Sequence, residues 1–326
     1  MRVLLVKLSS LGDVIHNLPV ATDLAQALPG IEIDWLTEAP YAELVALHPA
    51  VRNVYPVHLR HLKKHWWSSA AWREWRADRL RVGARKFDRV LDTQGLLKSA
   101  WVARWADAPI AGYGAASARE PMAARFYAQQ FDVPRDLHAV VRNRRLAAQA
   151  FGYELTPVID YGLRNALPPP PWLPTAPFAV FLHGTSRADK QWPQAHWIAL
   201  GRELDARGLQ VLLPWGSAAE RATADQLAAA IPQASVAPAM SLVDAAGMLS
   251  RAAAVIGVDT GLAHLAVALQ RPTVGIYLTT SPRLTGLAGG VGAVNLGDGS
   301  AARPDCPPVE AVLAALQSVL NEKTST

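Results

Sequence analysis

Residues 6–19 read VKLSSLGDVIHNLP, and this stretch decides how the first half of the chain folds. An apolar, strand-like run over residues 3–8 ends in a polar turn, and a helical pattern follows Gly12. Such a strand–turn–helix junction is typical of an α/β sheet, whose ligands bind at the carboxyl ends of the strands. Asp13 has two interpretations here: a helix cap suited to the helix dipole, or a catalytic carboxylate at the first strand end.

Strand and helix patterns alternate along both halves of the chain. In the first half we expect strands at 2–8, 31–37, 51–57, 87–93 and 109–113, and helices at 21–28 and 97–106. Pro19 is unfavourable inside a helix, so the first long helix begins near Asn17 or is kinked. In the second half we expect strands at 178–183, 209–214, 235–238, 254–258 and 273–277, and helices at 194–207, 218–231, 242–251, 262–269 and 309–321.

The domain boundary is marked by NALPPPPWLPTAP, residues 165–177, which holds six prolines. Proline-rich segments are stiff and form neither helix nor sheet interior. We therefore predict an N-terminal domain (1–164), this linker (165–177) and a C-terminal domain (178–326), each a Rossmann-like parallel sheet facing a central cleft. The last helix could pack back on the first domain.

Composition narrows the class of protein. The 326 residues are 51% hydrophobic and 18% charged, which is a globular composition. Cys306 is the one cysteine, so no intramolecular disulfide forms and a reducing compartment is expected. We find no secretory signal and no apolar run of the roughly 18–20 residues that span a bilayer. A cytoplasmic protein is expected.

Positive charge is concentrated in the first half. Residues 1–164 hold 22 Lys/Arg against 16 Asp/Glu, whereas residues 165–326 hold 10 against 11. Segment 60–89 alone carries ten basic and three acidic residues, together with Trp66, Trp67, Trp72 and Trp75. Trp67, Ala71 and Trp75 are spaced as one helical stripe. That stripe indicates a membrane-surface or nucleic-acid-stacking helix, or equally a partly buried amphipathic helix.

Three strand ends in the second half carry ligand-binding side chains. AVIGVDTGLAHLAVAL (254–269) places Asp259, Thr260 and Gly261 where a helix begins, a natural diphosphate site, with His264 one turn later. HGTSRADKQWP (183–193) offers hydroxyls and a lysine, and PWGSAAE (214–220) ends in an acidic first turn. The alternatives are plain helix caps and a solvated loop. No Asp-x-Asp and no spaced His/Cys cluster occurs, so we expect no metal site.

Together, several stretches resemble one family of sugar transferases: MRVLLVKLSSLGDVIHNLP, DWLTEAPYAEL, LDTQGLLKSA, SAREPMAARFYA, DKQWPQAHW and VDTGLAHLAVAL. They are similar to the lipopolysaccharide heptosyltransferases I of the ADP-heptose:LPS heptosyltransferase family, in the same order from Met1 to about Tyr277. The resemblance implies a GT-B fold. It also implies inverting transfer of L-glycero-D-manno-heptose from ADP-heptose to the Kdo of Kdo-lipid A, without a cofactor and without nucleic acid.

The resemblance also implies residue roles. Asp13 matches the catalytic base, and Lys190 matches the lysine that binds the donor phosphates. The other implied donor-binding residues are Thr185, Ser186, Glu220, Met240, Asp259, Thr260, Gly261 and His264. The implied acceptor-binding residues are Arg60, Lys63, Lys64, Arg119 and His138. Because the acceptor is a lipid, the enzyme is expected at the cytoplasmic face of the inner membrane.

This sequence differs from the family pattern at two places, and two alternative functions are considered. Ser186 stands where the family often has a second Thr, and LTTSP (278–282) replaces a Gly-Pro-Thr-Asp-Pro type of run, so that loop receives no role. The first rival is heptosyltransferase II or another ADP-sugar transferase with a different acceptor. The second is a non-catalytic polyanion- or membrane-surface-binding protein, which has no use for two phosphate loops or for Asp13.

Overall fold

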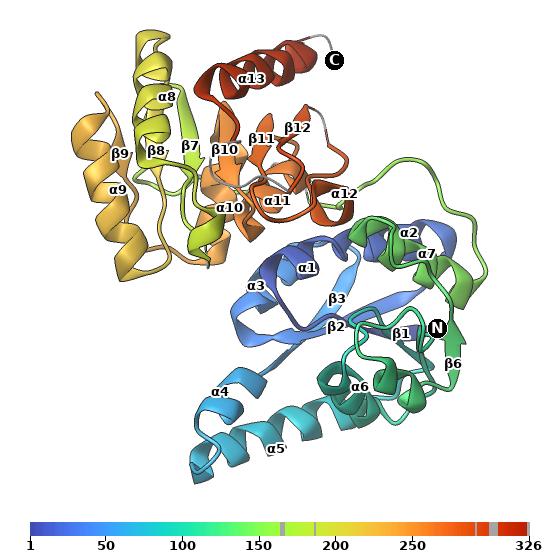
Figure 1. The fold of residues 1–326 in the computed structure, drawn as a ribbon. Helices are drawn as coiled ribbons and strands as arrows, with labels where there is room; N and C mark the ends of the chain where they lie inside the picture. Colours follow the sequence, from blue (N-terminus) through green and yellow to red (C-terminus); the bar gives the residue numbers. More distant parts are fainter. Residues whose placement is uncertain (164–166, 186, 291, 300–305, 325–326) are drawn as a thin grey trace. The chain divides into compact units, whose positions relative to one another are not determined.

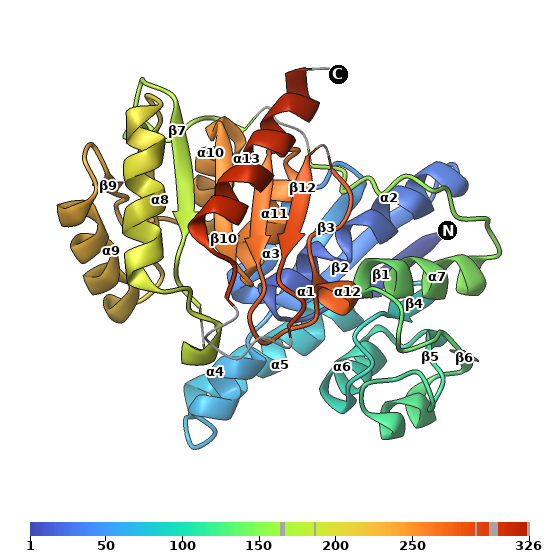
Figure 2. The ribbon, with the colours of Figure 1, turned by 45° about the horizontal axis from the view of Figure 1, so that its top comes forward.

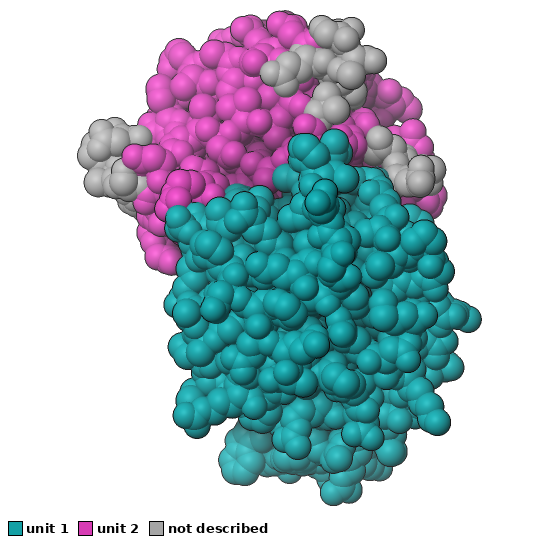
Figure 3. All heavy atoms as spheres, turned by 90° about the vertical axis from the view of Figure 1, so that its right-hand side faces the viewer, with its two compact units in different colours: residues 1–163 teal, residues 164–326 magenta. Residues whose placement is uncertain are grey.

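The computed structural model describes residues 1–163, 167–185, 187–290, 292–299 and 306–324. The chain divides into two compact units, Met1–Leu163 and Arg164–Thr326; Figure 3 colours them separately. Each unit is one parallel sheet covered by helices (Figure 1). The described part of the proline-rich stretch, residues 167–177, belongs to unit 2.

Unit 1 has the strand order β3-β2-β1-β4-β5-β6, and every pairing in it is parallel. Its central strands are apolar and buried, as in sheets covered on both faces. The strands are β1 (Arg2–Val6), β2 (Glu32–Glu38), β3 (Val51–Val57), β4 (Arg89–Asp92), β5 (Ile110–Tyr113) and β6 (Gln129–Phe131). The helices are α1 (Leu11–Ile15), α2 (Leu18–Ala27), α3 (Ala42–Ala46), α4 (Leu59–Lys64), α5 (Ser69–Gly83), α6 (Leu97–Ala103) and α7 (Ala139–Phe151).

Unit 2 repeats this plan with the order β12-β11-β10-β7-β8-β9. Figure 2 shows α8 and α13 over one face of the sheet and α10 and α11 over the other. The strands are β7 (Phe178–Leu182), β8 (Gln210–Leu213), β9 (Ser235–Val236), β10 (Ala254–Val258), β11 (Thr273–Ile276) and β12 (Ala293–Leu296). The helices are α8 (Gln194–Ala206), α9 (Ala218–Ala230), α10 (Leu242–Arg251), α11 (Gly261–Ala268), α12 (Pro282–Thr285) and α13 (Val309–Thr324), and the turn η4 spans Ala188–Lys190.

The predicted fold class, two Rossmann-like parallel sheets, is confirmed. Asn17 caps α2 and Pro19 is its second residue, so the helix begins near Asn17 and is not kinked there. The pattern missed the edge strands β6 and β12 and helix α7. Within unit 2, α13 packs on β11 and β12; its packing on the first domain stays a prediction. No helix in the described ranges is long and apolar enough to cross a bilayer.

Candidate active site

The predicted donor-binding residues follow the strands of unit 2 at one edge of its sheet. β7 is the first strand of this unit, and its neighbours in the sheet are β8 and β10. The chain therefore leaves β7 and β10 in opposite directions, which opens a crevice between the loops that follow them. Asp259 and Thr260 come after β10, and Thr185 and Lys190 come after β7. The topology thus brings the two predicted phosphate loops side by side.

Asp259 joins three segments of unit 2 at this crevice. Its Oδ2 accepts hydrogen bonds from Lys190 Nζ at 2.6 Å and from Thr280 Oγ1 at 2.7 Å. His264 Nε2 lies 3.9 Å from the other oxygen, Oδ1. The Lys190 and Asp259 side chains are only 15% and 14% exposed, so water screens this ion pair weakly.

The electrostatics keep Asp259 ionised. Burial alone raises the pKa of its carboxyl group, but hydrogen bonds from His264, Lys190 and Thr280 outweigh burial and hold the pKa below its ordinary value. Asp259 is therefore an anion at neutral pH and fixes the Lys190 ammonium at the crevice. The plain-cap interpretation of Asp259 is wrong, because Thr260 is the residue that precedes α11 as its N-cap.

The first turn of α11 adds a second anion-binding element. The Thr260 side chain makes no capping hydrogen bond with the helix, and Gly261 is the first helical residue. The N-terminus of a helix presents backbone N–H groups and a partial positive charge, which together favour a phosphate. Lys190 and this helix end therefore place two positive elements at one crevice.

Glu220 and Thr185 line a separate hollow beside the crevice. A cavity of about 260 Å³ lies between the loop after β7 and the start of α9, and both residues border it. Glu220 Oε2 accepts a hydrogen bond from Gly216 N at 2.6 Å, and Ser217 Oγ caps α9 by accepting from Glu220 N. The structure leaves Met240 half-buried before α10. Ser186 lies outside the described residues.

Asp13 lies at the equivalent strand end of unit 1, in the first turn of α1. Its Oδ2 accepts from Ser10 N at 2.8 Å and from Ser10 Oγ at 3.0 Å. The helix-cap interpretation therefore holds in part, with Ser10 as the cap and Asp13 as its partner in a capping box. These two hydrogen bonds hold the Asp13 carboxylate at the end of β1. The role of Asp13 as a catalytic base stays a prediction.

The pattern missed Lys7, which is buried directly after β1, on the strand end that leads to Asp13. Lys7 is 5% exposed and donates from Nζ to the Thr93 carbonyl at 2.6 Å. Burial lowers its pKa to about 8, while the nearby charges of Asp13 and Asp92 act against that shift. The charges of Arg142 and Arg119 lower it further. The sequence feature that could have indicated this residue is a lysine at the end of an apolar strand.

The loop that carries Asp13 is held by residues of the LDTQGLLKSA stretch. Gln94 accepts from Leu8 N through Oε1 at 2.8 Å and donates from Nε2 to the Ser9 carbonyl at 2.6 Å. Lys98 Nζ donates to Ser9 Oγ at 3.0 Å. Gln94 in the loop after β4 and Lys98 at the start of α6 thus order the loop after β1.

The predicted acceptor residues fall into two groups. His138 caps α7, and its ring lies 5.5 Å from that of His16, the residue that ends α1. His16 is three residues after Asp13, and Arg119 is one of the cations that lower the pKa of Lys7. The other group lies on α4 and is exposed; its members are Arg60, Lys63 and Lys64. Arg60 lies over the Tyr41 ring at 5.5 Å.

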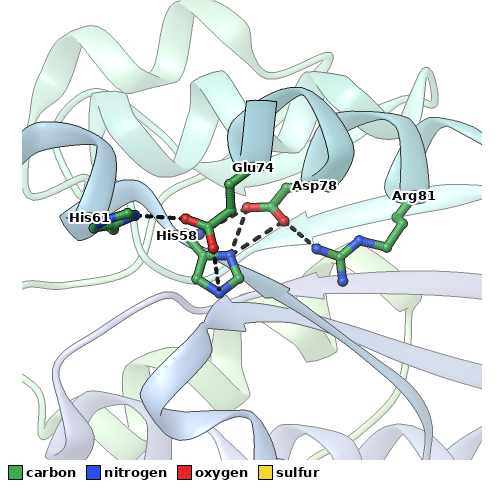
Figure 4. A network of polar contacts seen from close by, with 5 residues as sticks. All are labelled: His58, His61, Glu74, Asp78 and Arg81. Carbon is green, nitrogen blue, oxygen red and sulfur yellow. Dashed lines mark hydrogen bonds and ion pairs between the residues drawn. The ribbon is translucent and has the colours of Figure 1, made fainter. Parts of the chain in front are cut away.

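A polar network joins α4 to α5, as Figure 4 shows. Asp78 Oδ2 accepts from His58 N at 3.0 Å, and Asp78 also pairs with Arg81. Glu74 Oε2 lies 2.8 Å from His61 Nδ1. These pairs fix the helical hairpin that carries Arg60, Lys63 and Lys64.

The predicted tryptophan stripe needs correction. α5 begins at Ser69, so Trp67 lies before it, in the turn, and is 69% exposed beside Trp66 at 66%. Trp75 instead stacks on Trp101 at 5.6 Å, and Ala71 is buried. The amphipathic-helix interpretation therefore holds for α5, and the exposed aromatic pair belongs to the turn.

Groups of three or more His, Cys, Asp or Glu side chains arranged to hold a metal are absent from the part of the chain that the structure describes. The expectation that the reaction needs no cofactor stays a prediction.

Comparison with known proteins identifies relatives over nearly the whole chain. Residues 75–303 match the model of glycosyltransferase family 9 (heptosyltransferase). Lipopolysaccharide heptosyltransferase 1 of Pseudomonas aeruginosa is 49% identical over 292 residues, 89% of this chain and 82% of that protein. The solved structure of E. coli heptosyltransferase WaaC with ADP matches with a TM-score of 0.90 at 39% identity, covering 98% of this chain and 100% of that one. WaaC with ADP-2-deoxy-2-fluoro heptose matches with a TM-score of 0.87 at 37% identity, covering 98% and 99%.

Proposed function

The chain belongs to glycosyltransferase family 9, the heptosyltransferases, and from this premise we propose that it transfers L-glycero-D-manno-heptose from ADP-heptose to the Kdo sugar of Kdo-lipid A. It is a glycosyltransferase that acts in the synthesis of the lipopolysaccharide inner core. The observation that carries the donor assignment is the Lys190 ammonium, held by Asp259 beside the N-terminus of α11. A diphosphate fits two such positive elements, and the related WaaC structure holds an ADP-heptose analogue.

Asp13 is the base in this proposal. It takes the proton of a Kdo hydroxyl while that oxygen attacks the anomeric carbon of the heptose. The bond between the anomeric carbon and the β-phosphate oxygen breaks on the opposite face, and ADP leaves with the electron pair. The configuration at that carbon is therefore inverted. The capping-box bonds from Ser10 orient the Asp13 carboxylate for this step.

Lys190 and the first turn of α11 stabilise the leaving diphosphate. Negative charge grows on the β-phosphate as the bond breaks, so a positive group fixed in advance favours the transition state over the ground state. Asp259 supplies that preorganisation, because it holds Lys190 Nζ at 2.6 Å in a weakly screened site. In this scheme Asp13 takes the proton of the acceptor hydroxyl, ADP leaves with the electron pair, and Lys190 binds the leaving diphosphate.

The acceptor side uses the basic residues of unit 1. Kdo-lipid A carries carboxylate and phosphate groups in an anionic membrane surface, and Arg60, Lys63 and Lys64 are exposed cations. The aromatic pair of the neighbouring turn, Trp66 and Trp67, suits the lipid–water interface. We further propose that the enzyme works at the cytoplasmic face of the inner membrane and binds no nucleic acid.

One assay tests the activity against its rivals. ADP release from ADP-heptose is measured with Kdo-lipid A and, separately, with heptosyl-Kdo-lipid A. We expect release with the first acceptor only. Preference for the second acceptor would assign the chain to the heptosyltransferase II reaction. Vesicle binding without any affinity for ADP-heptose would instead support the non-catalytic rival.

A set of variants tests the acceptor surface. Replacing the three α4 cations by alanine should raise the acceptor KM and flatten its dependence on salt, and leave donor affinity unchanged. The matched control removes the same charge from exposed positions outside the hairpin: Arg125, Arg135 and Arg145. Equal effects of both triple variants would show that only net charge matters, and a loss of donor affinity would refute the division of substrates between the units.

A further inference from the structure

The Gln94 side chain is buried in the loop after β4, and none of the catalytic steps above uses it. β1 and β4 pair as far as Val6, whose carbonyl accepts from Thr93 N at 3.2 Å. Beyond that point the Gln94 amide continues the pairing: Oε1 accepts from Leu8 N at 2.8 Å and from Ser9 N at 3.3 Å, and Nε2 donates to the Ser9 carbonyl at 2.6 Å. One side chain therefore satisfies the backbone groups directly after β1, which buried backbone requires.

Asp92, the last residue of β4, fixes Gln94 in turn. Its carboxylate is completely buried, and Oδ1 accepts from Gln94 N at 2.8 Å and from Gly95 N at 3.3 Å. The other oxygen, Oδ2, accepts from the hydroxyl groups of Ser99 and Tyr127, both at 2.8 Å. A buried carboxylate costs stability, and a neutral side chain would hold a turn without that cost. A fully bonded network of this kind rigidifies the segment that it contacts, here the loop that presents Gln94.

The neighbouring strand β5 leaves room for this network. The Tyr127 ring lies on β5 at Gly112, where an added Cβ atom would overlap the ring carbons. Glycine at this position lets the Tyr127 hydroxyl reach Asp92. Burial and the Asp92 charge raise the pKa of Tyr127, so its hydroxyl keeps its proton and acts as the donor. Asp92 is therefore bonded to groups from three segments: the loop after β4, α6, and the residues before β6.

The loop that Gln94 holds leads directly to the Asp13 carboxylate. Ser10 N and Ser10 Oγ donate to Asp13 Oδ2 at 2.8 Å and 3.0 Å. The position of this carboxylate therefore depends on the backbone of the two preceding residues, 8 and 9, which Gln94 holds by three hydrogen bonds. A displacement of about 1 Å at a reacting group can cost about 10²-fold in rate. We propose that Gln94, itself fixed by Asp92, is a positioning residue that orients Asp13 for removal of the acceptor proton.

This inference rests on the proposed function, in which Asp13 is the base, and a double-mutant cycle tests it. Gln94→Ala is made in the wild type and in Asp13→Asn, and ADP release with Kdo-lipid A is measured for each protein. In the wild type we expect kcat to fall about 10- to 100-fold, with the acceptor KM and the Kd for ADP within about twofold. In Asp13→Asn the same substitution should lower the residual rate by less than about twofold, because Gln94 acts through Asp13.

Further variants extend the cycle. Asp92→Asn keeps the shape of the side chain but loses an acceptor oxygen, so kcat should fall about 3- to 10-fold in the wild type and not fall further in Gln94→Ala. Gln94→Glu keeps the length but sets a carboxylate oxygen against the Ser9 carbonyl. It should lose kcat as Gln94→Ala does, and it takes the place of that variant if Gln94→Ala fails to fold. Gln130→Ala is the matched control, because it removes a glutamine-to-carbonyl hydrogen bond of 3.0 Å from the same unit, and it should keep the wild-type kcat.

The outcomes separate this inference from the proposed function. Equal losses of rate from Gln94→Ala in the wild type and in Asp13→Asn would overturn the inference and leave the proposed function intact. A loss confined to the acceptor KM would do the same, since it would make Gln94 part of the acceptor site. Wild-type turnover in Asp13→Asn would remove the base from the proposed function and overturn this inference with it.

Discussion

Lys190→Met removes the ammonium group at the phosphate crevice and keeps an unbranched side chain. A hydrogen bond to a charged group contributes about 1.5–3 kcal/mol, and each 1.4 kcal/mol is tenfold in affinity. We therefore expect ADP-heptose to bind about 10- to 150-fold more weakly. Asp259 keeps its bonds to Thr280 and His264 in the variant, so the free protein should not rearrange. The carboxylate of Asp259, no longer neutralised by Lys190, now repels the diphosphate, so we expect the loss of affinity to lie near the upper end of this range.

The assay is calorimetric binding of ADP and ADP-heptose together with steady-state ADP release. The turnover number should fall as well, because the charge on the leaving group is greatest in the transition state. Arg187→Met is the matched control: it removes a cation from the same loop, where Arg187 is 60% exposed and already paired with Asp189. This control should leave donor affinity within about twofold of wild type, the ordinary size of a surface substitution.

Equal donor affinity in Lys190→Met and wild type would refute the reasoning, since it would make Lys190 a solvated loop residue. Equal losses in Lys190→Met and Arg187→Met would refute it differently, by showing that the net charge of the loop matters and the Asp259 contact does not. A salt titration separates these cases, because a screened surface charge loses its effect at high ionic strength.

Three more expectations follow from the same geometry. Asp13→Asn should reduce transfer by about 10²–10⁴-fold with donor binding nearly intact; wild-type turnover would exclude Asp13 as the base. Thr280→Val removes the second bond to Asp259 Oδ2 and should weaken donor binding about tenfold, whereas Thr280→Ser should behave like wild type; equal losses in both would mean that the methyl group matters. Because the pKa of Lys7 is lowered to about 8, its cation is lost as the pH rises through 8, so kcat/KM for the acceptor should fall above that pH while the Kd for ADP stays flat. If kcat/KM for the acceptor stays constant up to pH 9, Lys7 takes no part in the reaction with the acceptor.

The sequence predicted the centre of each sheet better than its edges. β1, β4, β7 and β10 are buried on both faces and therefore read as short apolar runs bounded by turns. The edge strand β6 is Gln-Gln-Phe, which carries no such signal, and it becomes a strand only because β5 lies beside it. Helix α7 was missed although its sequence has an amphipathic pattern.

The same distinction applies to the site. The places of Asp259 and Thr260, directly after β10, and of Glu220, in the first turn of the helix after β8, could be predicted because α/β folds bind their ligands at this edge of the sheet. Thr280 could not, because its importance comes from Asp259, 21 residues earlier in the chain. In the sequence, Lys7 only interrupts an apolar strand. Its contact with the Thr93 carbonyl depends on the pairing of β1 with β4, which the local sequence does not show.

The burial of Lys7 has a consequence for the tolerance of unit 1 to mutation. Lowering its pKa from 10.5 to about 8 corresponds to about 3 kcal/mol of lost stability at neutral pH, since the unfolded chain holds this proton more tightly. The deficit is complete below pH 8 and disappears as the pH rises towards 10.5. A domain is stable by roughly 5–15 kcal/mol, so this one buried lysine removes a sizeable part of the margin against harmful substitutions. Unit 1 should therefore evolve under tighter constraint on its core than its apolar sheet alone would require.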